Sequence, residues 1–285
     1  MTELRPPPKA LAPVWLWPNL LGLDAPLVAV SWQLLFARTF GISLPPAIHV
    51  VLGLSVWCVY LADRLYDACR AKDFSNATWR LRFTKQHFPV LATTTAVAAC
   101  VNLFLIARFV PGHLLVHGLV TAGLLAFYYA FRFGSPGKVA TVVPREIMCG
   151  MVFAIGSTIA PFSYSQPETS GIPFLGAVTM LGLVCSASCI LISVWERDAD
   201  LASGDRSIAS GKPGIPPRFR KFLLPLVLLY GIVAFADPWQ IHIATGLSAL
   251  ALAAMVRFEE NIPATLLRAL ADGVLLTPLF FIAFA

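Results

Sequence analysis

The sequence has few charged residues for its length. Only 13% of its 285 residues are Asp, Glu, Lys or Arg, while 58% are hydrophobic. Soluble globular domains carry about 25% charged and about 45–50% apolar residues, so this chain lacks the polar surface that a water-soluble domain needs. The composition also argues against a disordered chain and, although the net charge is +6, against a nucleic-acid-binding module.

The sequence also lacks paired cysteines and a cleavable signal peptide. Its six cysteines are scattered and none forms a C-x-x-C pair; the closest two, Cys185 and Cys189, share a helix face. This spacing argues against a zinc site or a disulfide framework, and we interpret the cysteines as small buried hydrophobic residues. The N-terminal segment MTELRPPPKALAP is polar and proline-rich, without the charged-then-apolar order of a signal peptide.

Long apolar runs, nearly free of charge, fill the rest of the chain. Runs of about 17–25 apolar residues are typical of helices that cross a bilayer. They predict an all-α integral membrane protein with an N-terminal tail, residues 1–20, and one transmembrane domain, residues 21–285. Nine transmembrane helices are expected in that domain, near residues 21–41, 47–67, 89–108, 113–132, 145–164, 173–196, 220–236, 238–257 and 263–285.

The positions of Lys and Arg predict the orientation in the membrane. If the N-terminus is cytoplasmic and nine helices alternate, all 21 Lys and Arg except Arg38 and Arg108 fall on the cytoplasmic side. Basic residues concentrate on that side of membrane proteins, so we expect the N-terminal tail in the cytoplasm. The two long cytoplasmic loops, 68–88 and 197–219, indicate that the chemistry takes place on this face of the cell (inner, cytoplasmic) membrane.

The second expected helix ends with two carboxylates on one face. Asp63 and Asp67 are four residues apart, so their side chains point the same way at the cytoplasmic end of the helix. Like charges at this spacing repel each other, whereas Mg²⁺ binds one or two carboxylates together with phosphate oxygens and water. A helix end that simply meets water is the alternative interpretation.

The sixth expected helix repeats this arrangement. Glu196 and Asp200 are again four residues apart at the cytoplasmic end. Acidic residues near the bilayer are rare and usually functional, and two matched pairs on non-adjacent helices are harder to explain as helix ends. If the two pairs face each other across a cavity, they could hold Mg²⁺ ions around a diphosphate.

These residues resemble the signatures of the UbiA superfamily of intramembrane prenyltransferases. The first signature, N-x-x-x-D-x-x-x-D, is matched at 59–67, with Val59 in place of the asparagine. The second, D-x-x-x-D-x-x-x-G-x-R-T-L, is matched at 196–208, with Glu196 in place of the first aspartate. A third feature, Y-x-x-x-K, reads Tyr128-x-x-x-Arg132. The helix number and orientation also fit, so the resemblance covers essentially the whole chain.

The resemblance implies a funnel-shaped UbiA-type bundle that uses Mg²⁺ and a prenyl diphosphate, with the prenyl tail open to membrane lipids. The prenyl group would pass to a lipophilic or aromatic acceptor that the sequence does not identify. The implied catalytic metal ligands are Asp63, Asp67, Glu196 and Asp200. The residues expected to bind the diphosphate are Arg64, Tyr128, Arg132, Lys138 and Arg206. The alternative for Lys138 is ordinary anchoring at the cytoplasmic face of the membrane. Because Val59 replaces the asparagine of the family, one contact to the metal or the diphosphate is absent or is supplied by another group.

Two other functions stay open. In a UbiA-type membrane terpene cyclase the prenyl cation is attacked by its own double bonds and no acceptor is needed, which Val59 and the lack of an acceptor-binding signature favour. The second alternative is a cation transporter. Against it, the acids are expected at one face rather than at the midplane, and no unwound helix centre is evident from the sequence.

Charged residues within the last expected helix are interpreted as structural. Arg268 and Asp272 are four residues apart, so they are expected to satisfy each other as an ion pair. His113 and His117 have the same spacing but belong to the far face, where surface histidines explain them better than a metal site.

Overall fold

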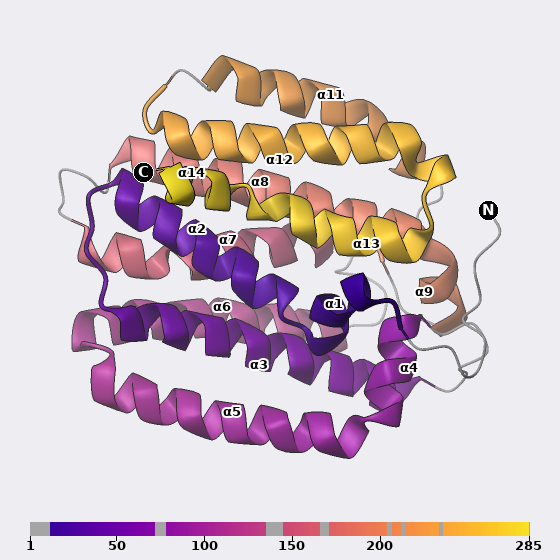
Figure 1. Ribbon diagram of the computed structural model, residues 1–285, viewed down its shortest axis with the longest axis horizontal. Coiled ribbons are helices and arrows are strands. Elements are labelled where there is room, and N and C mark those ends of the chain that lie inside the picture. The colour runs from indigo at the N-terminus through magenta and orange to yellow at the C-terminus, as the bar shows by residue number, and fades with distance from the viewer. Residues whose placement is uncertain are drawn as a thin grey trace.

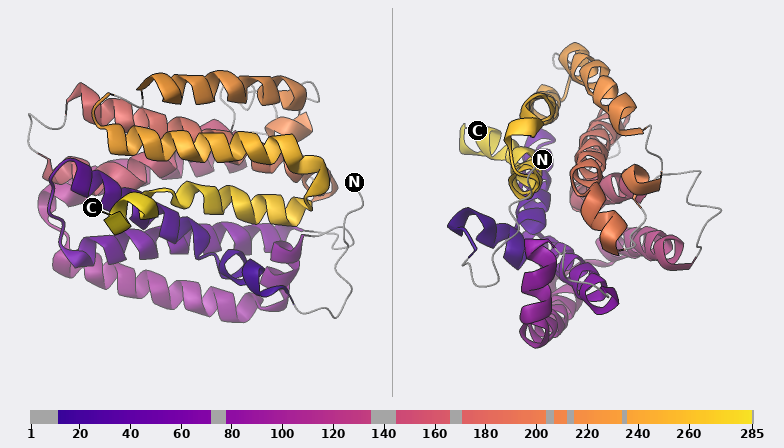
Figure 2. Two further views of the ribbon diagram at one scale, coloured as in Figure 1. Left: turned by 45° about the horizontal axis from the view of Figure 1, so that its top comes forward. Right: turned by 90° about the vertical axis from the view of Figure 1, so that its right-hand side faces the viewer.

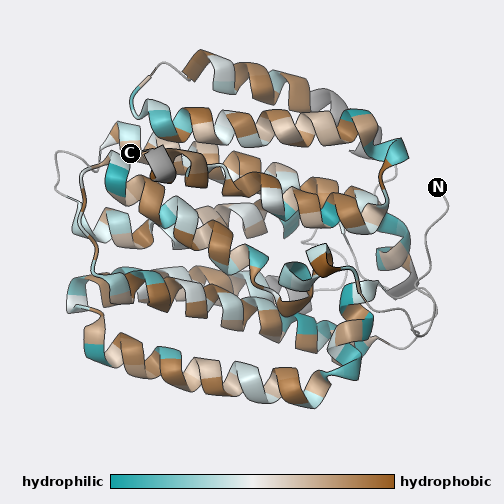
Figure 3. Ribbon diagram, in the orientation of Figure 1, coloured by the Kyte–Doolittle hydropathy of each residue, from teal (hydrophilic) through white to brown (hydrophobic). Residues whose placement is uncertain are grey.

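The computed structural model describes residues 12–71, 78–134, 145–165, 171–203, 207–211, 215–233 and 236–284. All regular elements in these ranges are helices, and the long ones lie side by side along approximately one axis (Figure 1). Apolar residues cover most of their length, and polar residues gather towards their ends (Figure 3). The predicted all-α fold is therefore confirmed for this part of the chain.

Each of the nine expected membrane segments contains a helix. The helices are α2 (Asp24–Thr39), α3 (Pro46–Arg70), α5 (Phe88–Phe109), α6 (Gly112–Gly134), α7 (Arg145–Tyr164), α8 (Ile172–Trp195), α11 (Ile215–Val233), α12 (Trp239–Phe258), and α13 (Ala264–Gly273) with α14 (Pro278–Phe284). By length and composition, seven of the described helices can cross a membrane, or up to eight if a bent pair at the N-terminus counts as one span. The apolar part of α11, Leu223–Val233, is shorter than a span. The structure therefore supports a multi-pass membrane protein.

The chain enters the first long helix through a sharp bend. The short helices η1 (Val14–Leu16) and α1 (Trp17–Leu21) meet α2 at an angle of 78°. Gly22 lies at the bend with a φ of 69°, and a Cβ there would lie 3.2 Å from the ring of Tyr60 on α3. Glycine suits both the left-handed backbone and this close approach. As a result, the first long helix starts at Asp24 rather than at residue 21.

The last membrane segment is broken near its middle, a feature that its sequence pattern does not predict. A 3-10 turn, η3 (Val274–Leu276), separates α13 from α14. Neighbouring helices satisfy the backbone carbonyls at the break: the indole of Trp32 donates to the Leu275 oxygen at 2.9 Å, and the Ser248 hydroxyl donates to the Val274 oxygen at 2.8 Å. Because backbone polar groups at membrane depth need partners, these bonds make the break part of the packed core.

Helix α8 is the most buried of the candidate spans, and its packing depends on a small residue of α7. In its most apolar window, 67% of the residues are buried. A Cβ on Gly150 of α7 would lie 2.3 Å from the backbone nitrogen of Ser186 on α8. Small residues at helix interfaces let backbones approach in this way within membranes. Gly150 therefore sets the distance between α7 and α8.

We expect the Gly150→Ala variant to unfold at a lower temperature than the wild type in the same detergent. The added methyl group must push α7 and α8 apart, and overpacking of this kind costs about 1–3 kcal/mol. The control is Gly176→Ala on α8, where a Cβ would meet no atom within 4 Å. Unfolding is measured by tryptophan fluorescence. Equal unfolding temperatures for the two variants would show that α7 and α8 do not pack in this way.

Two short helices lie at the end of the bundle where α3 and α8 finish. They are α4 (Trp79–Gln86) and α9 (Arg197–Ser203), and the right-hand view of Figure 2 looks onto this end of the molecule. A third, α10 (Ile208–Gly211), contacts α8 and α9. The elements that carry the acidic motifs therefore meet at a single end of the bundle.

Candidate functional site

The two acidic motifs lie at the same end of the bundle. Asp63 and Asp67 occupy the last two turns of α3, Glu196 directly follows α8, and Asp200 is on α9. All four residues are partly buried. The fold thus brings to one end four acids that are far apart in the sequence.

Arg80 of α4 connects the two motifs electrostatically. Its Nη2 lies 3.9 Å from Oε2 of Glu196. Burial lowers the pKa of Arg80, but nearby negative charge, above all that of Glu196, raises it above its usual value. Asp67 and Asp63 also raise this pKa, so both carboxylates lie within electrostatic reach of the same guanidinium. The sequence alone does not distinguish Arg80 from the other basic residues in the loop 68–88.

Arg268 of α13 also pairs with Glu196, which corrects the predicted Arg268–Asp272 ion pair. Nη1 of Arg268 donates a hydrogen bond to Oε2 of Glu196, and the two side chains are only 11% and 14% exposed. Charged groups this buried need a partner, because losing one leaves an uncompensated charge. Glu196 is therefore held by Arg80 and Arg268, neither of which belongs to the predicted motifs.

Arg64, which is expected from the sequence to bind the diphosphate, has hydrogen-bond donors without a partner among the described residues. The residue is only 4% exposed, its guanidinium lies 4.4 Å from the centre of the Tyr60 ring, and its Nη1 donates to the Leu20 oxygen at 2.9 Å. Its Nε and Nη2 are buried and have no hydrogen-bond partner among the described residues. Such buried donors are costly and often mark the place of an ion or a water. Arg64 is therefore well suited to bind an anion.

A second group of polar side chains joins the N-terminal bend to the last membrane segment. Nδ2 of Asn19 donates to Asp24 at 2.6 Å and lies 3.5 Å from Oδ2 of Asp272. Asp272 thus contacts Asn19 of α1, whereas Arg268, one turn earlier on its own helix, pairs with Glu196.

Glu146 of α7 ties α10 to the membrane bundle. Its Oε1 accepts a hydrogen bond from the backbone nitrogen of Ile208 at 3.1 Å and lies 3.7 Å from Nε of Arg145. Glu146 also lies in the first turn of α7, where a carboxylate interacts favourably with the helix dipole. The last residue of the second motif, Ile208, is therefore anchored to α7.

The other residues named from the motifs are placed less completely. Lys138 and Arg206 lie outside the described residues, and of Arg132 only the backbone, near the end of α6, is described. Tyr128 is buried on α6, with its ring 5.3 Å from that of Tyr129. Val59 is partly buried on α3, one turn before Asp63.

The acidic residues suit a metal ion that is bound jointly with a substrate. Within the described ranges, no group of three or more His, Cys, Asp or Glu side chains is arranged to hold a metal ion. The acids of the two motifs come instead as two pairs. Mg²⁺ uses one or two carboxylates and completes its shell with phosphate oxygens and water. These pairs are the residues that could hold a Mg²⁺ ion together with phosphate oxygens.

No protein-family model and no curated protein matches this sequence. The acidic end of the bundle, with its two carboxylate pairs and its buried arginines, is therefore the main guide to function.

Proposed function

We propose that this protein transfers a prenyl group from a prenyl diphosphate to a lipophilic or aromatic acceptor within the membrane, with Mg²⁺ at the acidic pairs. The observation that carries the proposal is that Arg80 pairs with Glu196 of the second motif and lies within electrostatic reach of Asp63 and Asp67 of the first, at one end of an apolar helical bundle. The diphosphate group of such a substrate would lie at this end, next to water, while its hydrocarbon tail would remain in the apolar region of the bundle. The resemblance to the UbiA superfamily supports the same assignment.

The chemistry follows from charge. Mg²⁺ would be held by Asp63, Asp67, Glu196 and Asp200, and when bound it neutralises the negative charge that develops on the departing diphosphate. Arg64 would bind phosphate oxygens through Nε and Nη2, for which the described part of the protein offers no partner. The remaining proposed contacts are Tyr128, Arg132, Lys138 and Arg206.

The proposal includes nine membrane spans, with the N-terminus and the acidic end on the cytoplasmic side of the cell membrane. The concentration of basic residues on that side supports this orientation. Alkaline phosphatase folds to its active form only outside the cytoplasm. Fused after residue 285 it should therefore be active, and fused after residue 71 it should be inactive. Inactive fusions at both positions would instead indicate an even number of spans.

A membrane terpene cyclase would use the same acidic site without an acceptor, and Val59 favours it by removing a polar group from the first motif. Incubation of the purified protein with Mg²⁺ and farnesyl, geranylgeranyl or longer diphosphates separates the two enzymes. A cyclic hydrocarbon formed without acceptor would establish the cyclase. Consumption of the diphosphate only after membrane lipid extract is added would establish the transferase.

Failure to consume any prenyl diphosphate under either condition would contradict both enzymes and favour transport. The break in the last membrane segment is the feature that a transporter would share, because discontinuous helices often carry ion sites. Here, however, the carbonyls of Val274 and Leu275 at the break already accept hydrogen bonds from neighbouring side chains. The break is therefore better explained by packing than by ion binding.

A further inference from the structure

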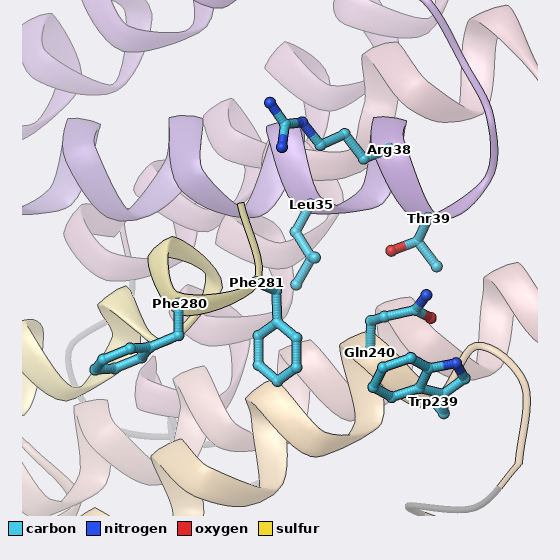
Figure 4. A pocket seen from close by; sticks show the side chains of 7 residues that line it. All are labelled: Leu35, Arg38, Thr39, Trp239, Gln240, Phe280 and Phe281. Atoms are coloured by element: carbon cyan, nitrogen blue, oxygen red, sulfur yellow. The ribbon is translucent and has the colours of Figure 1, made fainter. Parts of the chain in front are cut away.

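We propose that the end of the bundle opposite to the acidic motifs binds an anionic phospholipid. A cavity of about 460 Å³ opens there between α2, α12 and α14, a volume within the range of ligand sites. Leu35, Arg38 and Thr39 of α2 line one side, and Trp239 and Gln240 of α12 line the other, with two phenylalanines of α14 at one edge (Figure 4). The proposed transferase or cyclase activity does not require this site.

The charge of the cavity favours an anionic ligand. Arg38 is the one charged residue among the described residues that line it, and none of these residues carries a carboxylate that would compete for the guanidinium. Arg38 is exposed, and its Nη1 donates to the Ile282 oxygen at 2.7 Å, which holds the side chain beside α14. A guanidinium has five N–H donors in a fixed fork that matches a phosphate group. The remaining donors can therefore bind a headgroup.

The position of Arg38 supports a role beyond orientation. In the proposed topology it is one of only two basic residues on the non-cytoplasmic side, where the distribution of Lys and Arg in membrane proteins does not favour it. The other, Arg108, lies at the end of α5 with its guanidinium 5.7 Å from the ring of Phe109, and it does not line the cavity. Arg108 is therefore a matched control for charge at this face.

The apolar residues of the cavity favour a lipid over a free phosphate. Trp239 is 45% exposed and Phe280 is 66% exposed, and both line the same cavity as Arg38. Tryptophan at the membrane interface typically lies at the level of the headgroups, with apolar residues reaching the acyl chains. A prenyl tail alone would leave the charge of Arg38 unused, so a ligand with a phosphate and acyl chains fits the whole cavity best.

The test is lipid binding to the full-length protein in a neutral detergent, measured by native mass spectrometry. Phosphatidylglycerol should bind more tightly than phosphatidylcholine. Arg38→Gln should weaken phosphatidylglycerol binding by about tenfold, the loss expected for a hydrogen bond to a charged group. Arg108→Gln should bind like the wild type, and Arg38→Lys should retain the preference for phosphatidylglycerol. Thermal unfolding without lipid checks that each variant is folded.

Several results would overturn the proposal. Equal binding of the two lipids, or equal losses in Arg38→Gln and Arg108→Gln, would show that Arg38 recognises no headgroup. Protection from unfolding by inorganic phosphate alone, at the concentration at which the lipid acts, would indicate a simple anion site. Displacement of the lipid by farnesol together with normal binding to Arg38→Gln would indicate a hydrocarbon site instead.

Discussion

Replacing Asp63 or Asp67 with asparagine should slow the consumption of prenyl diphosphate by about a hundredfold or more, because each change removes a negative charge from the metal site. Asparagine has the same shape as aspartate, so the end of α3 should remain folded. The rate is measured as diphosphate release at saturating Mg²⁺, and folding is checked by the unfolding temperature in detergent.

Asp198→Asn is the matched control for these variants. Asp198 lies on α9, two residues before Asp200, but it is exposed and occupies a position that the motif leaves unspecified. Its replacement should leave diphosphate release within about twofold of the wild type, since surface changes away from specific contacts have small effects. If all three variants lost activity equally, general surface charge would explain the result, and the assignment of Asp63 and Asp67 as metal ligands would be wrong.

Replacing Arg64 with methionine should weaken diphosphate binding while leaving the stability of the free protein almost unchanged. If its partnerless donors face the diphosphate, Arg64→Met should weaken diphosphate binding by about tenfold to a hundredfold, the usual effect of losing hydrogen bonds to a charged group. The unfolding temperature should change little, because exchanging an incompletely satisfied buried charge for an apolar side chain of similar length is often neutral. Binding is measured by titration with the diphosphate, and stability by thermal unfolding of the free protein.

Arg70→Met is the control for the loss of one arginine from α3. Arg70 is exposed near the end of the same helix and donates to the hydroxyl of Tyr66 at 3.0 Å. This variant should bind the diphosphate almost normally. A large loss of stability in Arg64→Met, with binding reduced no more than in Arg70→Met, would identify Arg64 as a structural residue.

Composition and periodicity predict the helical bundle because long apolar runs are a local property. Composition and periodicity do not predict the breaks in the helices near the two ends of the chain. The bend at Gly22 depends on Tyr60 from another helix, and the break after α13 depends on hydrogen bonds from Trp32 and Ser248. A run of apolar residues is compatible with a continuous or a broken helix, so only tertiary contacts distinguish these two possibilities.

The site shows the same division between local and long-range information. The spacing of four residues predicts that Asp63 and Asp67 share a face, and it equally predicts an Arg268–Asp272 pair. The second prediction is wrong because Arg268 reaches Glu196 on another segment. Arg80 could not be distinguished from its basic neighbours, because its role depends on where α4 folds back relative to the ends of α3 and α8.

The central claim is that the acidic pairs bind a prenyl diphosphate through Mg²⁺. Calorimetric titration with farnesyl thiodiphosphate, in which sulfur replaces the bridging oxygen and slows bond breaking, tests it without turnover. We expect binding in the presence of Mg²⁺, strong weakening when EDTA removes the metal, and a similar weakening in Asp67→Asn and Asp200→Asn. Equal affinity with Mg²⁺ and with EDTA, unchanged in both variants, would contradict the claim.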